Sequence, residues 1–321
     1  MISSNASSPG RSPADVDLGV AVGALSFRNP IIAASGTFGY GLEFARVVDL
    51  GKLGGLVTKG LSREPIAGAP APRLCETPSG MLNAIGLQNV GVRAFVKQKL
   101  PALRNFDVPV LANVFGYCRE DYVEVIRILE DAEGLAGYEL NISCPNVRKG
   151  GLQFGSDPAM AAEVTRSARK AAVQRPLWVK LSPLIADIGL MARAVEQEGA
   201  DALTVANTYP AMMIDFRTQK SRLGNPTGGL SGPAIRPITL RLVWEAWKSV
   251  KIPVIALGGV ETASDVLDYI TVGAAAVQVG TASFADPGAS ERLASELRCA
   301  CFEHNIRSFN QLRGKFSAEI G

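Results

Sequence analysis

The feature that most restricts the fold is a rhythm that starts at residue 31, where short strand-like apolar runs begin to alternate with helical ones. This alternation is typical of βα units around a parallel sheet. About eight such units in 321 residues favour an α/β fold of the (β/α)8 TIM barrel type over a doubly wound sheet. No G-x-G-x-x-G follows the first strand, which argues against a dinucleotide-binding fold.

The expected strands are Ile31–Ala34, Gly55–Lys59, Pro109–Val114, Gly137–Ile142, Leu177–Leu181, Ala202–Ala206, Pro253–Leu257 and Ala275–Val279. The expected helices are Leu42–Val48, Gly91–Leu103, Glu120–Ala132, Pro158–Ala172, Ile188–Glu198, Ala234–Ser249, Ala263–Ile270 and Ala289–His304.

The segments outside this rhythm suggest one domain with additions. Residues 1–17 are rich in Ser, Pro and Ala and lack the apolar core of a secretory signal, so we expect a disordered N-terminal lead-in. Residues 18–27 predict a short β-hairpin that plugs one end of the barrel, with Gly23 in its turn. No linker divides residues 18–321, which we expect to form a single barrel domain. The long loops 60–90 and 208–232 follow strands, on the face where barrel active sites lie.

Composition and cysteine spacing exclude several classes of function. A net charge of +3 is too small to indicate binding to nucleic acid or an anionic membrane. No apolar window reaches the length of a membrane span. The five Cys include no C-x-x-C pair, so we expect no metal site, and their scatter favours a reducing, cytoplasmic location. The single His, His304, is far from any strand end, which argues against a Ser-His-Asp or Cys-His nucleophile.

Polar side chains gather at the expected C-terminal ends of the strands. Lys59 and Lys180 each end an apolar run, so their amines should point into the mouth of the barrel. Because carboxylates are scarce at these strand ends, we expect a bound ligand as their partner. Cys144 follows the fourth strand between amides, where a thiol suits proton transfer. An isolated Cys in such a turn is more often a small buried apolar residue.

The last two strand ends predict a phosphate site. Gly258 and Gly259 follow one strand, and Gly280 and Thr281 follow the next. Glycines let backbone N–H groups approach an oxyanion, and the loops after strands 7 and 8 often bind phosphate in such barrels. Two tight βα turns would explain the same glycines without a ligand. Together with the two lysines and the amides, these two glycine-containing strand ends favour a flavin mononucleotide (FMN) pocket.

The sequence resembles the class 1 dihydroorotate dehydrogenases, and most closely their B-type catalytic subunit. The most specific matches are the string N-I-S-C-P-N, residues 141–146, and the string M-L-N-A-I-G-L-Q-N, residues 81–89. Further matches are A-S-G-T-F-G at 34–39, V-K-L-S-P at 179–183 and G-G-L-S-G-P-A at 228–234. The matches span nearly the whole chain from residue 31 onward.

The resemblance implies an enzyme of pyrimidine biosynthesis that oxidises dihydroorotate to orotate. Cys144 would take the C5 proton, and the C6 hydride would pass to N5 of FMN, with one FMN per chain. The implied FMN contacts are Ser35, Lys59, Gly60, Asn113, Asn141, Lys180, Ala206, Gly232, Gly258, Gly259, Gly280 and Thr281. The implied substrate contacts are Lys59, Asn83, Ala84, Ile85, Gly86, Leu87, Asn141, Asn146, Asn207 and Thr208.

The resemblance also implies partners. We expect a homodimer, or a heterotetramer in which a second subunit carries FAD and a 2Fe–2S cluster and passes electrons to NAD. The alternatives are a fumarate-dependent A-type enzyme, a relative that acts on other dihydropyrimidines, and a flavin-binding barrel without catalysis. Three departures from the family pattern bear on the pocket walls and the acceptor: Ala69, Leu184, and the Tyr209-Pro210-Ala211-Met212 stretch.

Overall fold

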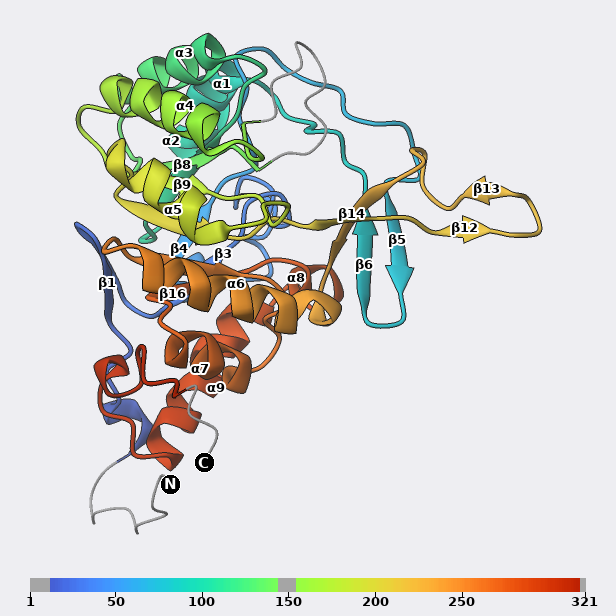
Figure 1. The fold of residues 1–321 in the computed structure, drawn as a ribbon. Coiled ribbons are helices and arrows are strands. Elements are labelled where there is room, and N and C mark those ends of the chain that lie inside the picture. Colours follow the sequence, from blue (N-terminus) through green and yellow to red (C-terminus); the bar gives the residue numbers. More distant parts are fainter. Residues whose placement is uncertain (1–11, 144–153, 318–321) are drawn as a thin grey trace.

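A closed barrel of eight parallel strands forms the centre of the computed structural model, which describes residues 12–143 and 154–317 (Figure 1). The strands follow chain order, and the barrel closes where β16 pairs with β3, with Val277 opposite Ile31. All eight predicted strands are confirmed, with ends within two residues of the expected ones. They are β3 (Ile31–Ala33), β4 (Gly55–Val57), β7 (Val110–Val114), β8 (Gly137–Asn141), β9 (Leu177–Lys180), β10 (Ala202–Val205), β15 (Val254–Leu257) and β16 (Ala276–Val279).

Helices surround the barrel and bury its outer face in one large apolar core. Six of the eight predicted helices are confirmed as continuous helices. The helical elements are α1 (Val92–Ala94), α2 (Leu100–Leu103), α3 (Arg119–Glu130), α4 (Pro158–Ala171), α5 (Ile188–Gln197), α6 (Arg236–Ser249), α7 (Ala263–Thr271), α8 (Ala282–Ala285) and α9 (Ala289–Glu303). Short 3-10 turns are η1 (Pro13–Asp15), η2 (Leu50–Lys52), η4 (Pro233–Ile235) and η5 (Phe309–Gln311).

Two predicted helices differ from the structure. The helix expected over 42–48 is wrong: this segment forms successive turns, in which the amides of Phe44 and Ala45 both donate to the carbonyl of Gly41. Gly41 has a φ of 93°, a left-handed conformation that interrupts a regular helix. The helix expected over 91–103 contains a π-helical stretch, η3 (Phe95–Lys99), directly before α2. Pro101 in α2 lacks an N–H, so the regular bonding pattern cannot continue through this turn.

The predicted N-terminal hairpin is confirmed. β1 (Val20–Val22) pairs antiparallel with β2 (Leu25–Phe27). Val22 and Phe27 are buried against inward side chains of the barrel strands, among them Trp178, whose ring centroid lies 5.9 Å from that of Phe27. The hairpin therefore closes the N-terminal end of the barrel. Residues 1–11 of the expected lead-in lie outside the described residues, and Val16 is already buried in the core.

The two long loops contain strands that we did not predict. β5 (Leu74–Thr77), β6 (Gly80–Asn83), β11 (Tyr209–Ala211) and β14 (Gly228–Ser231) form an antiparallel sheet in the order β11-β14-β6-β5, which we call the capping sheet. A further hairpin, β12 (Ile214–Asp215) with β13 (Lys220–Ser221), extends from it as an arm (Figure 1).

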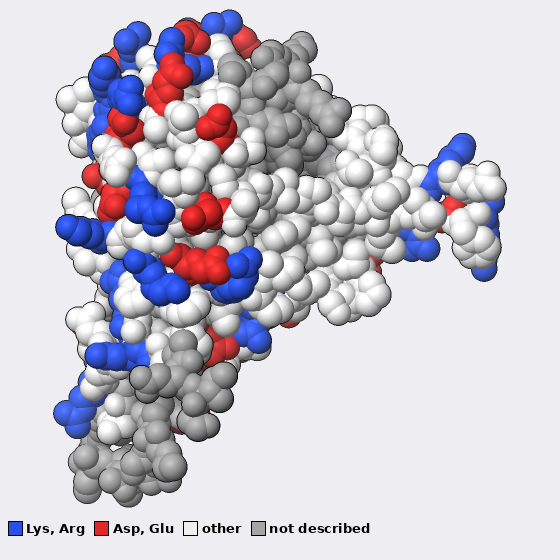
Figure 2. Space-filling view, in the orientation of Figure 1, with Lys and Arg blue, Asp and Glu red and all other residues white. Residues whose placement is uncertain are grey.

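The surface shown in Figure 2 carries positive and negative side chains interspersed over the helices, while the flank below the arm is mostly uncharged. Among the described residues, no helix has the length and apolar character needed to cross a membrane. The same residues contain no group of three or more His, Cys, Asp or Glu placed to hold a metal ion.

Candidate active site

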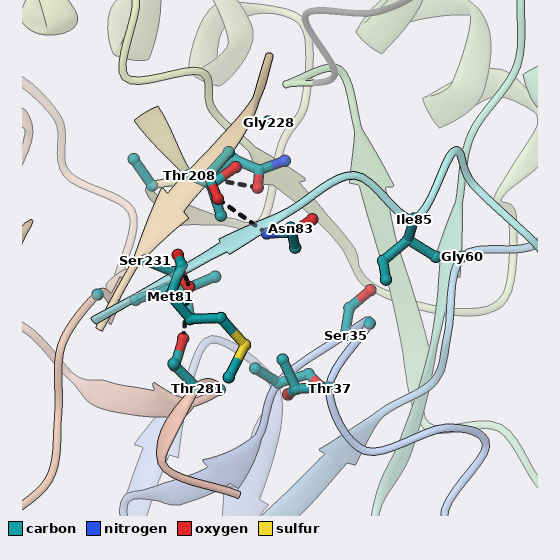
Figure 3. A pocket seen from close by; sticks show the side chains of 18 of the residues that line it. Ser35, Thr37, Gly60, Met81, Asn83, Ile85, Thr208, Gly228, Ser231 and Thr281 are labelled. Carbon is teal, nitrogen blue, oxygen red and sulfur yellow. Dashed lines mark hydrogen bonds between the residues drawn. The ribbon is translucent and has the colours of Figure 1, made fainter. Parts of the chain in front are cut away.

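A cavity of about 340 Å³ lies between the C-terminal ends of the barrel strands and the capping sheet. Its volume is within the range of small-molecule and cofactor sites. Figure 3 shows side chains of both layers around it, with Met81, Asn83 and Ser231 from the capping sheet and Ser35 and Thr37 from the segment after β3.

Every predicted site residue that the structure describes lines this one cavity. Cys144 and Asn146 lie outside the described residues. The predicted residues that line the cavity are Ser35, Lys59, Gly60, Asn83, Ala84, Ile85, Gly86, Leu87, Asn113, Asn141, Lys180, Ala206, Asn207, Thr208, Gly232, Gly258, Gly259, Gly280 and Thr281.

Two of the predicted amides are joined through a serine that sequence reasoning missed. The amide of Asn207 donates to Ser143 Oγ at 2.6 Å, and Ser143 Oγ donates to Asn141 Oδ1 at 2.6 Å. The backbone N–H of Ser143 also donates to Asn141 Oδ1, at 3.2 Å. Because Ser143 is buried, this chain fixes both amides at the mouth of the barrel, directly before Cys144. The adjacency of Ser143 to Asn141 and Cys144 is the sequence signal that could have identified it.

Polar contacts hold the capping sheet together and connect it to the barrel. Asn83 Nδ2 on β6 donates to the carbonyl of Gly229 on β14 at 3.2 Å. Thr281 Oγ1, after β16, donates to Ser231 Oγ on β14 at 2.7 Å. A Cβ added at Gly229 would lie 2.0 Å from Thr208 Oγ1, so only glycine allows Thr208 its position. The bond between Thr281 and Ser231 therefore connects the two layers around the cavity.

Lys59 presents a partly buried cation to the cavity. Burial lowers the pKa of the Lys59 ammonium from its ordinary value of 10.5, and the positive charge of Arg73 lowers it further, while Glu43 opposes the shift. No ion pair of Lys59 is found among the described residues, which agrees with the expectation of an anionic ligand beside it.

A bound ligand was expected as the partner of Lys180, and the structure also places a buried carboxylate beside it. Glu139 on β8 is fully buried, and its Oε1 lies 4.0 Å from Lys180 Nζ. Sequence reasoning missed Glu139, although it is two residues before Asn141 and strand residues two apart share a face. Lys180 itself is 4% exposed and lines the cavity.

The glycines at the last two strand ends are of two kinds. Gly259 has a φ of 68°, and a Cβ at Gly258 would lie 2.7 Å from Thr239 Oγ1, so the fold itself requires glycine there. At Gly280 φ is not in the left-handed region, and an added Cβ would meet only ordinary contacts at 3.6 Å or more. The fold therefore does not require glycine at position 280, where the cavity wall has room for a Cβ.

These residues fit an FMN group. Asn113 Oδ1 is buried, lines the cavity and has no hydrogen-bond partner among the described residues, so it is an acceptor available to a ring N–H. Gly280 leaves the space that a phosphate would occupy, and Lys180 is a cation for an electron-rich ring edge.

Comparison with known proteins gives consistent matches. The family model for dihydroorotate dehydrogenase matches residues 17–300. A relative from Solibacter usitatus, provisionally named dihydroorotate dehydrogenase A (fumarate), is 54% identical over 92% of this chain and 97% of its own. Relatives named dihydroorotate dehydrogenase B (NAD(+)), catalytic subunit, include one from Geobacter sp. strain M21, 51% identical over 93% of this chain and 97% of its own. Another, from Trichlorobacter lovleyi, is 52% identical over 92% of this chain and 97% of its own.

Proposed function

Because the chain belongs to the dihydroorotate dehydrogenase family, we propose that it oxidises dihydroorotate to orotate in pyrimidine biosynthesis, with FMN bound in the cavity. The observation that carries this proposal is that the predicted flavin and substrate residues within the described part of the chain line a single cavity. The family is flavin-dependent. We also propose that residues 18–321 act as one FMN-binding domain and that the protein works in the cytoplasm.

We assign the substrate to the face of the cavity below the capping sheet. Lys59 and the backbone of residues 85–87 would hold the substrate carboxylate, because the ammonium has no ion-pair partner within the described residues. Asn83, Asn141 and Asn207 would hydrogen-bond the ring edges, with Asn146 and Thr208 beside them. The chain from Asn207 through Ser143 to Asn141 supports this assignment because it orients two amides before any ligand binds.

Cys144 would be the base that takes the C5 proton. Its neighbour Ser143 is fixed by hydrogen bonds to Asn141 and Asn207, which anchors the backbone next to the thiol. When bound, FMN supplies the two-electron acceptor for the C6 hydride. Lys180 would lie at the electron-rich edge of the flavin, and Asn113 would accept from its ring N–H. The capping sheet would exclude bulk water from the reacting atoms.

The direct test is an anaerobic titration of the FMN-loaded protein with dihydroorotate, followed by the visible absorbance of the flavin. We expect stoichiometric bleaching. A retained but unchanged flavin spectrum would contradict the proposed substrate and would favour a different dihydropyrimidine or a flavin-binding barrel without catalysis.

We propose NAD as the final acceptor, reached through a partner subunit that carries FAD and a 2Fe–2S cluster. The names of several relatives near 50% identity support this B-type assignment. The 54% identical relative with an A-type name favours fumarate as the alternative. Co-purification of a cluster-bearing chain in a heterotetramer, with NAD reduction that requires it, would support the B-type. A homodimer that reduces fumarate alone would support the A-type.

The lowered pKa of Lys59 predicts the pH dependence of ligand binding. A lysine with a lowered pKa loses its charge at a lower pH than an ordinary lysine, so affinity for the orotate carboxylate should fall as pH rises through that value, before the ordinary 10.5. The measurement is the dissociation constant of orotate against pH, from the perturbed flavin spectrum.

The matched control for this prediction is Lys59→Met, which keeps the length of the side chain without its charge. We expect about 30-fold weaker binding of orotate, from the loss of about 2 kcal/mol in a buried charge pair. Because the variant lacks the ammonium, the pH dependence of its orotate affinity shows any contribution from the titration of orotate itself. Profiles of the same shape for both proteins would show that Lys59 does not bind the carboxylate.

A further inference from the structure

The carboxylate of Glu139 lies inside the barrel, below the floor of the cavity, and is surrounded by donors. Its Oε1 accepts from Asn113 Nδ2 at 2.8 Å. Its Oε2 accepts from Thr204 Oγ1 at 2.8 Å and from Gln278 Nε2 at 2.6 Å. The donors come from three different strands, β7, β10 and β16. These three hydrogen bonds fix the position of the carboxylate at a site with no solvent exposure.

Among the described residues, Lys180 provides the one cation in ion-pair range of this carboxylate. Its Nζ lies 4.0 Å from Glu139 Oε1, and the two side chains are 5% and 0% exposed. The other neighbours of Glu139, namely Asn113, Thr204 and Gln278, are neutral. Within residues 12–143 and 154–317, the remaining titratable side chains that line the cavity are Lys59, Tyr117 and Glu261. Lys180 therefore has its counter-ion built into the barrel whether or not a ligand is bound.

A buried amine behaves differently with and without such a counter-ion. Burial alone disfavours the ammonium form of a lysine, while a carboxylate beside it favours that form. Glu139 would therefore support the charge of Lys180 while the flavin is oxidised, and without Glu139 more of the protonation would await the anionic reduced flavin.

We propose that Glu139 is a positioning residue that keeps Lys180 protonated and aimed at the flavin before electrons arrive. This inference rests on the proposed binding of FMN. The carboxylate fixes the ammonium from below, and the positive charge stabilises the reduced ring without a coupled protonation of Lys180. Asn113 connects the two layers, because its amide nitrogen binds Glu139 while its unpartnered Oδ1 borders the cavity.

The test is the midpoint potential of bound FMN against pH, measured with redox dyes so that dihydroorotate is not needed. In Glu139→Gln, reduction of the flavin by two electrons should be accompanied, over part of the pH range, by the uptake of one additional proton at Lys180. The reduction equilibrium would then change by a further factor of ten per pH unit, which corresponds to about 30 mV per pH unit. The matched control is Thr204→Val, which removes one hydrogen bond to Glu139 but keeps its charge, and whose profile should parallel that of the wild type.

Parallel profiles for Glu139→Gln and the wild type would overturn the inference. The double variant Glu139→Gln with Lys180→Met removes both charges, so it guards against failure of the single variant to fold. We expect it to follow the wild-type slope at a lower potential. A steeper slope, or an unchanged potential, would show that the effect does not pass through Lys180. Failure of every variant and the wild type to bind FMN would instead refute the proposed function.

Discussion

Replacing Cys144 with alanine should slow reduction of the bound flavin by dihydroorotate by about 10²- to 10⁴-fold, the usual contribution of a general base. The carboxylate and ring contacts assigned to Lys59 and the amides do not involve the thiol. We therefore expect orotate to bind the variant with nearly unchanged affinity. Stopped-flow absorbance under anaerobic conditions measures the rate, and perturbation of the flavin spectrum measures binding.

The matched control for this prediction is Cys299→Ala. Cys299 is an exposed, free cysteine on α9, away from the cavity. Its substitution should leave the rate of reduction unchanged, which separates the loss of one particular thiol from any general effect of removing cysteine. A Cys144→Ala protein that is reduced at the wild-type rate would exclude Cys144 as the base.

Replacing Gly280 with valine should weaken FMN binding while the protein remains folded. Because an added Cβ at this position would meet only ordinary contacts at 3.6 Å or more, the empty barrel should tolerate the side chain. The same side chain would occupy the space assigned to the phosphate. An overpacking cost of about 1–3 kcal/mol corresponds to a roughly 5- to 150-fold weaker affinity for FMN.

Two measurements on the apoprotein decide this prediction. Quenching of FMN fluorescence gives the affinity, and the thermal midpoint without FMN gives the stability of the fold. Gly288→Ala is the control, because Gly288 lies outside the cavity and an added Cβ there would meet only the side chain of Asp286, with Oδ1 at 3.3 Å. If the Gly280 variant binds FMN normally, the phosphate does not lie at this turn.

The barrel strands could be predicted because each combines a short apolar run with a clear end. β9, for example, is fully buried and ends at Lys180, where the apolar run stops. The wrong helix over 42–48 has a different origin, since its apolar spacing is helical but the left-handed Gly41 precedes it. Local patterns identify elements whose own residues decide their conformation.

The capping sheet could not be predicted because its strands lack local strand signals. β11 contains Pro210, and β14 begins with two glycines, both of which disfavour a strand. Pro210 is tolerated because β11 is an edge strand of the sheet. Gly229 is required by the close approach of Thr208 from another part of the chain. These strands depend on tertiary contacts that no single segment reveals.

The candidate site was predictable where its residues follow strand ends, and less so inside the barrel. Asn113, Asn141 and Lys180 stand out because polar residues end apolar runs. Glu139 was missed because it lies inside the strand and not at its end. It is two residues before Asn141, so the alternation of the strand places both side chains on the same face. Which oxygen of Glu139 meets which donor depends on the register of four strands, which the sequence does not contain.

The pairing of the first barrel strand with the last has a consequence for biosynthesis. β3 completes its pairing only with β16, and Thr281 just beyond β16 holds the capping sheet through Ser231. A nascent chain still short of this point on the ribosome has neither a closed barrel nor a complete cavity. Cofactor capture must therefore follow the synthesis of the chain up to at least Thr281, so a shortage of flavin would leave closed but empty barrels rather than partly synthesised ones.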